Sequence, residues 1–329
     1  FINQGESDGR PVFIEAALEV GLGSEGEEYG LGAILTDIDR DGDLDLYVAN
    51  DTNPNRLYLA ERDPNHPRGV RLLERQDAEA GDRNSGMGVA SGDFTGDGRF
   101  DLFVTNFGDQ RHTVLTNESL PGAPRFADGL TVAKLPNLGV GLTGWGTSWG
   151  DLDLDGDLDL FVVSGNVPVV DMEADRQPIE VFLNQSVEGE VGKFVNGDAA
   201  LGVNDVRTII GRGSAMGDFD NDGDLDVAVV DLGGRLMLLE NIAPPGNWLV
   251  VVLEEPEPGT VVSVTLPGGA VLEREVHAGS SYLSSEDPRP HFGLGEAATV
   301  RTVTVTWPDG ATVELRELAA NQAVLVERR

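Results

Sequence analysis

Aspartates at alternate positions mark four nine-residue segments, at residues 37–45, 93–101, 151–159 and 218–226, built on the pattern DxDxDGxxD. Side chains at positions 1, 3 and 5 can converge on one point only where the chain turns sharply. A glycine at position 6 permits that turn, because glycine tolerates positive φ. Since Ca²⁺ takes six to eight oxygen ligands at about 2.3–2.6 Å, the spacing predicts four calcium sites.

The candidate ligands are the residues at odd positions of each segment. In chain order they are Asp37, Asp39, Asp41, Asp43, Asp45, Asp93, Thr95, Asp97, Arg99, Asp101, Asp151, Asp153, Asp155, Asp157, Asp159, Asp218, Asp220, Asp222, Asp224 and Asp226. The second segment departs most from the pattern, with Thr95 at position 3 and Arg99 at position 7. It offers fewer carboxylates than the others, so we expect it to bind calcium most weakly.

The residues after each segment distinguish these sites from EF-hands. An EF-hand requires a glutamate at position 12 and a helix on either side. Position 12 is valine in all four segments, and the preceding residues are apolar, as in Leu46-Tyr47-Val48. Aromatic and β-branched residues favour strands. The sequence therefore predicts calcium loops that each join two strands.

Ordinary solvated turns are the alternative, because aspartate and glycine dominate turns for conformational reasons alone. The regular repeat of the segments argues against it. Successive segments start 56, 58 and 67 residues apart, a period typical of a four-stranded propeller blade. A glycine stands five residues before each segment, where a small residue lets inner strands crowd around an axis. These are Gly32, Gly88, Gly146 and Gly213.

Composition restricts the partners and the compartment. The 329-residue chain carries a net charge of −34, which disfavours binding to nucleic acids and to anionic membranes. No apolar run is long enough to span a bilayer. The chain begins at Phe1, and we expect a leader to have been removed. It has no cysteine, so we expect bound calcium rather than disulfides to stabilise the fold. Calcium sites of this kind fit a location outside the cell, where calcium is millimolar.

Past residues 243–245 the repeat stops and short apolar segments predict a second, all-β domain. We expect the first domain to span residues 1–242 and the second residues 243–329. The loop period and the flanking strands of the first domain resemble the FG-GAP, or VCBS, repeats. The second carries GSSYLS at 279–284, HFGLG at 291–295 and WPDG at 307–310, and is similar to the ASPIC/UnbV module.

These resemblances imply an all-β fold, a β-propeller of four-stranded blades with Ca²⁺ loops followed by a small sandwich-like β domain. They also imply secreted proteins with many bacterial members. The number of blades stays open, because the strands expected at residues 1–3 and 12–14 match only the outer half of a blade. Three arrangements are possible: closure by pairing these strands with the last blade, a fragment of a larger propeller, or completion by a neighbouring subunit.

Other candidate functional residues are few. Trp145 and Trp149 would offer a sugar-binding platform if exposed, but alternation along a strand favours their burial. Asn117 and Asn184 begin N-glycosylation patterns, which are short enough to arise by chance. No histidine lies in a loop, and His291 is expected to make a structural hydrogen bond. Without a nucleophile motif or a phosphate-binding loop, the sequence does not indicate an enzyme.

The sequence thus favours an adhesion-type binding or scaffold protein at the cell surface or secreted, stabilised by up to four Ca²⁺. Its ligand would be an unidentified protein or glycan. A self-assembling extracellular structural protein, completed by strand pairing between subunits, is the alternative. A carbohydrate-binding propeller is a third possibility.

Overall fold

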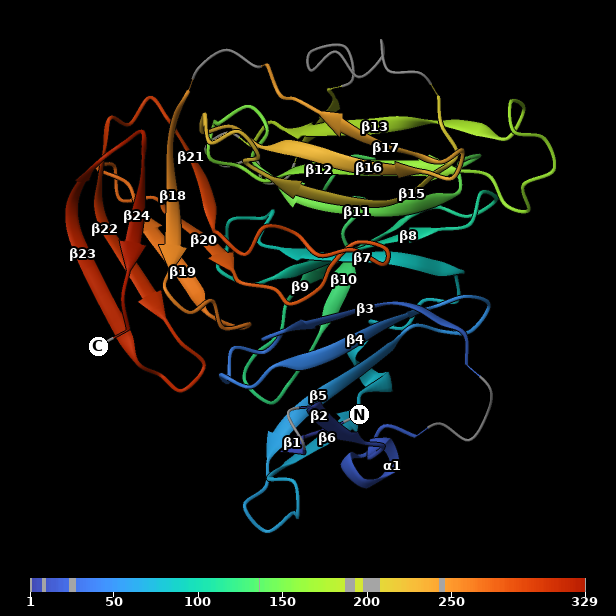
Figure 1. Ribbon diagram of the computed structural model, residues 1–329, viewed down its shortest axis with the longest axis horizontal. Helices are drawn as coiled ribbons and strands as arrows, with labels where there is room; N and C mark the ends of the chain where they lie inside the picture. Colours follow the sequence, from blue (N-terminus) through green and yellow to red (C-terminus); the bar gives the residue numbers. More distant parts are fainter. Residues whose placement is uncertain are drawn as a thin grey trace.

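The computed structural model describes residues 2–7, 10–23, 28–135, 137–186, 193–197, 208–242 and 246–328 (Figure 1). Phe1 and residues 243–245, where the domain boundary is expected, lie outside these ranges. The described chain is almost entirely β-structure, as predicted. Its helical elements are a four-residue helix, α1 (Ala17–Val20), and a single 3₁₀ turn at Gln76–Ala78.

Four antiparallel sheets follow the period of the acidic segments, and each is called a blade below. Blade 1 contains β3 (Gly30–Thr36), β4 (Asp45–Asn50), β5 (Arg56–Arg62) and β6 (Val70–Glu74). Blade 2 contains β7 (Gly86–Gly92), β8 (Asp101–Asn106), β9 (Thr113–Asn117) and β10 (Phe126–Asp128). Blade 3 contains β11 (Gly144–Gly150), β12 (Asp159–Gly165), β13 (Arg176–Asn184) and β14 (Phe194–Asn196). Blade 4 has three described strands, β15 (Gly211–Gly217), β16 (Asp226–Asp231) and β17 (Arg235–Leu239).

The inner strands β3, β7, β11 and β15 lie side by side in chain order, and the blades fan out from them (Figure 1). The predicted glycines make this crowding possible. A β-carbon on Gly32 would lie 2.3 Å from the carbonyl oxygen of Met87 in the next blade, and one on Gly88 would lie 2.0 Å from that of Trp145. Gly146 meets the amide of Ser214 in the same way, at 2.6 Å. The expected role of these glycines is confirmed.

Apolar side chains fill the space between neighbouring blades. Tyr47, Phe103 and Phe161 each lie ten residues after the start of a loop. They belong to the apolar clusters that blades 1, 2 and 3 form with the next blade. The three clusters are separate, because each lies between a different pair of sheets. Each blade is therefore held by its neighbours, and the acidic loops all emerge at the same end of the sheets.

The N-terminal strands do not close the ring. β1 (Ile2–Ser7) and β2 (Arg10–Ile14) form their own two-stranded sheet, while β17 is an edge strand of blade 4. Figure 1 places this hairpin and β17 at opposite ends of the molecule. Closure by strand pairing is therefore wrong for the described residues, because the intervening blades hold the two strands apart.

The second domain is a sandwich of two sheets, as expected. One sheet has the order β21-β18-β24 and the other β20-β19-β22-β23. Their bounds are β18 (Asn247–Leu253), β19 (Val261–Thr265), β20 (Val271–Glu275), β21 (His291–Gly295), β22 (Thr299–Thr306), β23 (Thr312–Ala319) and β24 (Gln322–Val326). Valine, leucine, phenylalanine and tryptophan side chains from both sheets fill one core, which includes Val251, Phe292 and Trp307.

The connection between β20 and β21 leaves the sandwich and runs along the inner strands of the blades. Ser281 exchanges backbone hydrogen bonds with Val89 in β7, and its hydroxyl accepts from the amide of Thr147 in β11 at 2.9 Å. A β-carbon on Gly213 would lie 2.7 Å from the carbonyl oxygen of Tyr282. The connection thus packs against Gly213 of β15, the last inner strand. Each earlier inner-strand glycine packs in the same way against the next inner strand.

Candidate metal centre

Each acidic loop turns at its glycine as the sequence predicts. Gly42, Gly98, Gly156 and Gly223 all have positive φ, between 83° and 107°. The aspartate at position 1 stabilises this turn in three loops by accepting a hydrogen bond from the glycine amide. The Oδ2–N distance is 3.0 Å for Asp37 and 2.9 Å for both Asp93 and Asp151.

The aspartate at position 9 ties each loop to the end of the third strand. One carboxylate oxygen accepts an amide from that strand, and the other accepts an amide from position 2 or 3 of the loop. These amides are those of Ala60, Asn117 and Asn184 in the third strands and of Asn241 just after β17, bonded to Asp45, Asp101, Asp159 and Asp226 at 2.7–2.9 Å. The loop amides are those of Ile38, Thr95, Leu152 and Phe219.

Carboxylates converge in the first, third and fourth loops. In each loop three aspartates offer oxygen atoms that lie within 4.8 Å of one another. The sets are Asp37, Asp39 and Asp41; Asp151, Asp153 and Asp159; and Asp218, Asp220 and Asp226. Positions 1 and 3 occur in every set, so the alternation read from the sequence does bring these side chains together.

Several carboxylate oxygens in these three loops are buried without a hydrogen-bond partner, although a buried polar atom is normally paired. They are Oδ1 of Asp39, Asp151, Asp153, Asp218 and Asp224, all in the same three loops. A carboxylate oxygen can only accept, so its partner must be a donor or a cation. Carbonyl and carboxylate oxygens are the ligands that Ca²⁺ prefers, and the donor set therefore fits this ion.

Burial and mutual repulsion make the metal-free loops costly. Burial raises the pKa of Asp37 to about 6, of Asp151 to about 7 and of Asp45 to about 8, with neighbouring carboxylates adding to each effect. In the fourth loop, burial and the charge of Asp222 raise the pKa of Asp224 to about 7. A divalent cation would remove the repulsion that these pKa values reflect.

The aspartates at positions 5 and 7 lie nearer the surface. Asp155 and Asp222 each accept the amide of the residue two positions on, at 3.0 and 3.2 Å. Asp43 pairs with Arg62, whose side chain is largely exposed. Asp157 has a pKa raised to about 6 by burial and by the charge of Asp155. Their participation in metal binding stays a prediction.

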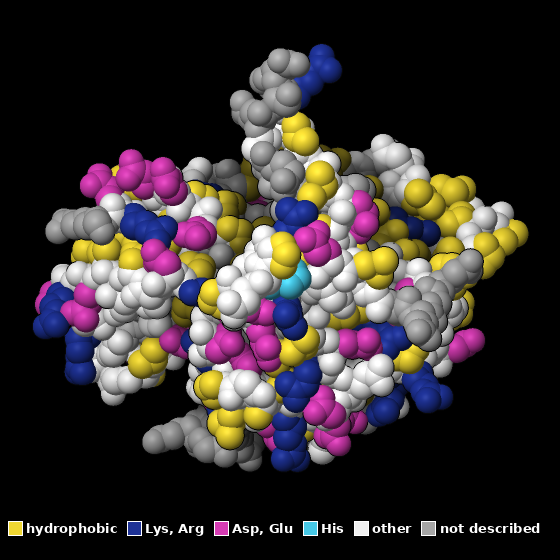
Figure 2. Space-filling model, turned by 90° about the horizontal axis from the view of Figure 1, so that it is seen from below, with side chains coloured by type: hydrophobic (Ala, Val, Ile, Leu, Met, Phe, Trp, Pro, Cys, Tyr) yellow, Lys and Arg dark blue, Asp and Glu magenta, His cyan; other side chains and the backbone are white. Residues whose placement is uncertain are grey.

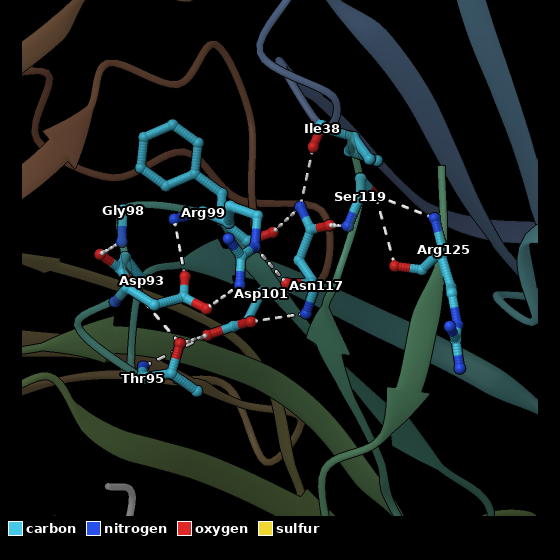
Figure 3. A network of polar contacts seen from close by, with 11 residues as sticks. Ile38, Asp93, Thr95, Gly98, Arg99, Asp101, Asn117, Ser119 and Arg125 are labelled. Atoms are coloured by element: carbon cyan, nitrogen blue, oxygen red, sulfur yellow. Dashed lines mark hydrogen bonds and ion pairs between the residues drawn. The ribbon is translucent and has the colours of Figure 1, made fainter. Parts of the chain in front are cut away.

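The second loop is balanced by its own side chains (Figure 3). The hydroxyl of Thr95 donates to Asp101 at 3.2 Å, and the guanidinium of Arg99 pairs with Asp97. An arginine side chain has no acceptor atom, so Arg99 offers a metal only its backbone carbonyl. Among the described residues, this loop has neither a converged carboxylate set nor a buried unpartnered oxygen.

Three asparagines that the sequence did not mark as site residues connect successive loops. Asn117 donates from Nδ2 to the carbonyl oxygen of Ile38 in loop 1 and of Phe100 in loop 2, at 2.8 and 2.9 Å (Figure 3). Asn184 bridges loops 2 and 3 in the same way, and Asn241 donates to loop 3. Their recurrence in or just after the third strand of blades 2, 3 and 4 was the available signal, but in two cases it coincided with a glycosylation pattern.

Burial changes the interpretation of those patterns and of the tryptophans. Asn117 and Asn184 are fully buried and their amides are engaged, so neither is accessible to a glycosyltransferase in the folded protein. Trp149 stacks on Phe94 with ring centroids 5.1 Å apart, and the indole of Trp145 donates to the carbonyl oxygen of Gly165. The sugar-binding platform is therefore wrong, and the expected burial of both tryptophans is confirmed, although β11 is buried on both faces and does not alternate.

The second domain contacts the loops directly. The amide of Gly293 donates to Oδ2 of Asp151 at 2.9 Å, and Glu275 accepts the amide of Asp37 at 3.1 Å. His291 bonds the carbonyl oxygen of Gly223 at 2.9 Å, which is the structural role expected for it. The second domain thus forms hydrogen bonds with the backbone of loops 1 and 4 and with the first aspartate side chain of loop 3.

Comparison with known families agrees with this architecture. A family model described as an FG-GAP-like repeat matches residues 37–104, which include loops 1 and 2. A second, described as ASPIC and UnbV, matches residues 255–329. The chain carries an FG-GAP-like repeat and an ASPIC and UnbV domain. Both resemblances noted in the sequence are confirmed.

The chain is similar over most of its length to longer curated proteins. Human cartilage acidic protein 1 is 29% identical over 332 residues, covering 95% of this chain and 45% of the relative. The mouse protein of the same name is 28% identical, covering 94% of this chain and 46% of the relative. The chain therefore spans about half the length of the curated relatives it matches. Among the described residues, no helix is long and apolar enough to cross a bilayer.

Proposed function

We propose that this chain is a secreted or cell-surface scaffold protein of the adhesion type, in which calcium holds the FG-GAP blades rigid and exposed connections contact a partner. The observation that carries the proposal is the convergence of aspartates in loops 1, 3 and 4, with buried carboxylate oxygens that lack a partner. Loop 2 is proposed as a weaker site. The similarity to cartilage acidic protein 1 supports an extracellular role.

Calcium would act on stability rather than on chemistry. Asparagine bridges connect each loop to the next, and the ASPIC domain covers the loops. Because of the bridges, repulsion within one loop acts on two blades. Binding to the native state alone stabilises it by RT ln(1 + [L]/Kd) per independent site, or about 4 kcal/mol at a thousandfold excess over Kd. The protein would then be most stable where calcium is millimolar.

A non-enzymatic role is supported by what the site lacks for chemistry. The described histidines lie outside the loops, and buried His112 and His291 both have pKa values lowered by desolvation, to about 3 and about 4. They are therefore neutral and enclosed at neutral pH. The carboxylates that converge are those suited to hold a hard cation in a closed cage.

For the partner, we propose contact through the connection between β12 and β13, which exposes two large apolar side chains, Val170 and Met172. A protein is the favoured ligand, and a glycan is a further candidate to be excluded with an array in calcium. The net charge of −34 disfavours nucleic acids. Figure 2 shows acidic and basic side chains interspersed over one face of the molecule rather than a continuous basic surface.

Self-association is the second candidate function, and blade 4 motivates it. In the described part of the chain β17 has no strand paired on its outer side, and Leu236 and Leu238 are 75% and 45% exposed. An edge strand with exposed apolar side chains favours pairing with another chain. A structural assembly would use this surface, whereas a monomeric scaffold would not.

One experiment tests both candidates. Thermal unfolding is followed in CaCl₂ and in excess EGTA, and static light scattering gives the mass of the same samples. A large calcium-dependent rise in melting temperature at monomer mass supports the calcium-stabilised scaffold. No rise contradicts the metal sites, and a calcium-dependent increase in mass favours assembly.

A further inference from the structure

Arg274 reaches from the ASPIC domain into the acidic loops. It lies in β20, and its guanidinium donates to the carbonyl oxygen of Glu273 at 2.9 Å and to that of Gly156, in loop 3, at 3.4 Å. The guanidinium lies over the ring of Phe292, 5.3 Å from its centroid. The side chain is thus fixed by two carbonyls and an aromatic ring, with its charge directed at the loops.

The charge of this cation acts on carboxylates of two loops. Its charge acts on Asp93, the first residue of loop 2, and on Asp151 and Asp157 of loop 3. Among the described residues it forms no ion pair within 4.0 Å, so its effect is electrostatic and shared. It also borders a cavity of about 90 Å³ between the two domains, with Asp151 and Asp218 in the same wall.

In loop 2, the loop's own arginine balances one of its three aspartates. Its own arginine, Arg99, pairs with Asp97 and leaves Asp93 and Asp101 without a cation of their own. Asp101 is fully buried, and Asp93 is nearly so. Loop 2 nevertheless has no unpartnered buried oxygen among the described residues. The positive charge of Arg274, which acts on Asp93, offsets part of the repulsion in this turn.

We propose that Arg274 is a built-in counter-cation, which the ASPIC domain supplies to loops 2 and 3 and which competes there with calcium. The inference rests on the proposed calcium binding and assigns a positioning role to one residue of the other domain. It implies that the two domains are coupled through charge. The arginine stabilises the metal-free loops and at the same time weakens their attraction for a divalent cation.

The arginine thus raises the stability of the metal-free protein and lowers its calcium affinity. This combination distinguishes a role of its charge from a role in packing. Replacing Arg274 by methionine keeps most of the apolar stem and removes the charge. The metal-free protein should then melt at a lower temperature, because the carboxylates lose their counter-charge. Calcium affinity should rise, because a like charge has left the site. Loss of packing alone would lower the melting temperature in both conditions and would not tighten calcium binding.

The test compares full-length wild type, Arg274→Met, Arg274→Lys and a control, Arg316→Met, whose guanidinium is exposed on β23. Each protein is melted in EGTA and in CaCl₂, and CaCl₂ binding is measured by isothermal titration calorimetry. Arg274→Met should bind calcium about tenfold more tightly at its weakest resolved site. Arg274→Lys keeps the charge and should resemble wild type, as should Arg316→Met.

Unchanged or weaker calcium binding by Arg274→Met would overturn the inference. So would a variant that stays unfolded in saturating calcium, because the metal should replace the missing charge. A double variant, Asp93→Asn with Arg274→Met, should recover part of the metal-free stability, and failure to recover any would also count against it. If wild type itself shows no calcium response, the proposed calcium function fails instead.

Discussion

The indole of Trp248, in the ASPIC domain, lies against Gly223, the turning residue of loop 4, so closely that a β-carbon on this glycine would be 2.0 Å from the ring. Tryptophan emission should therefore report on calcium at this loop. Adding CaCl₂ to EGTA-treated protein should change the emission, and Trp248→Phe should lose much of that change. Trp307→Phe, in the ASPIC core, is the control. A full response in Trp248→Phe would show that the loop does not move against the ring.

The loops should differ in their contribution to stability. Asp155→Ala or Asp222→Ala, in loops with converged carboxylates, should lower the melting temperature in calcium by about 5–15 °C, the effect of losing one tightly bound ion. Asp97→Ala should cost less, because Arg99 already pairs with Asp97 in the weaker loop. Differential scanning calorimetry in CaCl₂ measures all three, and equal losses would contradict the ranking of loop 2.

The glycine contacts between inner strands predict a local steric effect. Gly88→Ala would place a β-carbon 2.0 Å from the backbone oxygen of Trp145, so two strands must separate. We expect a loss of about 3 kcal/mol or more in the free energy of unfolding, measured by urea denaturation. Gly268→Ala is the control, because a β-carbon there meets no atom within 4 Å. A neutral Gly88→Ala would mean that the blades are less tightly packed than described.

Buried His112 predicts a loss of stability in acid. Burial lowers its pKa to about 3, and its Nδ1 accepts the amide of Asn106 at 3.0 Å. Below the unfolded-state pKa of about 6.5 the unfolded chain takes up a proton that the native state excludes, so stability is present above pH 6.5 and falls as the pH falls towards 3. Between pH 7.5 and 5.5 this costs about 1.4 kcal/mol.

The histidine contribution is isolated by comparing wild type with His112→Asn in saturating calcium. Asparagine retains an acceptor near the position of Nδ1 but does not titrate. Urea denaturation at each pH should give wild type the steeper decline, whatever the difference between the two proteins at pH 7.5. Parallel pH profiles would show that His112 titrates normally.

The asparagine bridges predict both a stability effect and an absence of modification. Asn184→Ala removes donors to the carbonyls of Phe94 and Leu158, which should cost about 1–3 kcal/mol by urea denaturation. Asn65→Ala, at an exposed asparagine, should be neutral. Mass spectrometry of protein secreted from a glycosylating host should find Asn184 unmodified; a glycan there would contradict its buried position.

The spacing of DxDxDGxxD predicted the loop turns, the flanking strands and the blade period, because each depends on residues close in sequence. Positive φ at Gly156 and burial of Tyr47 both follow from local pattern. The lack of a converged carboxylate set in loop 2 was also predictable, since Thr95 and Arg99 replace aspartates of the pattern. The same local information did not indicate the bridging role of Asn184, whose partners lie in two different loops.

Only the tertiary structure decided how the two domains meet. No short-range pattern indicates that Gly293 would bond Asp151, or that Arg274 would lie among carboxylates of loops 2 and 3. Nor could it show that the N-terminal hairpin forms its own sheet, apart from β17. By itself the sequence determined the repeating unit, because its turns and strands are local. The arrangement of these units and of the second domain depended on packing and charge between residues far apart in the sequence, such as Gly32 and Met87 or Gly293 and Asp151, which only the folded chain brings together.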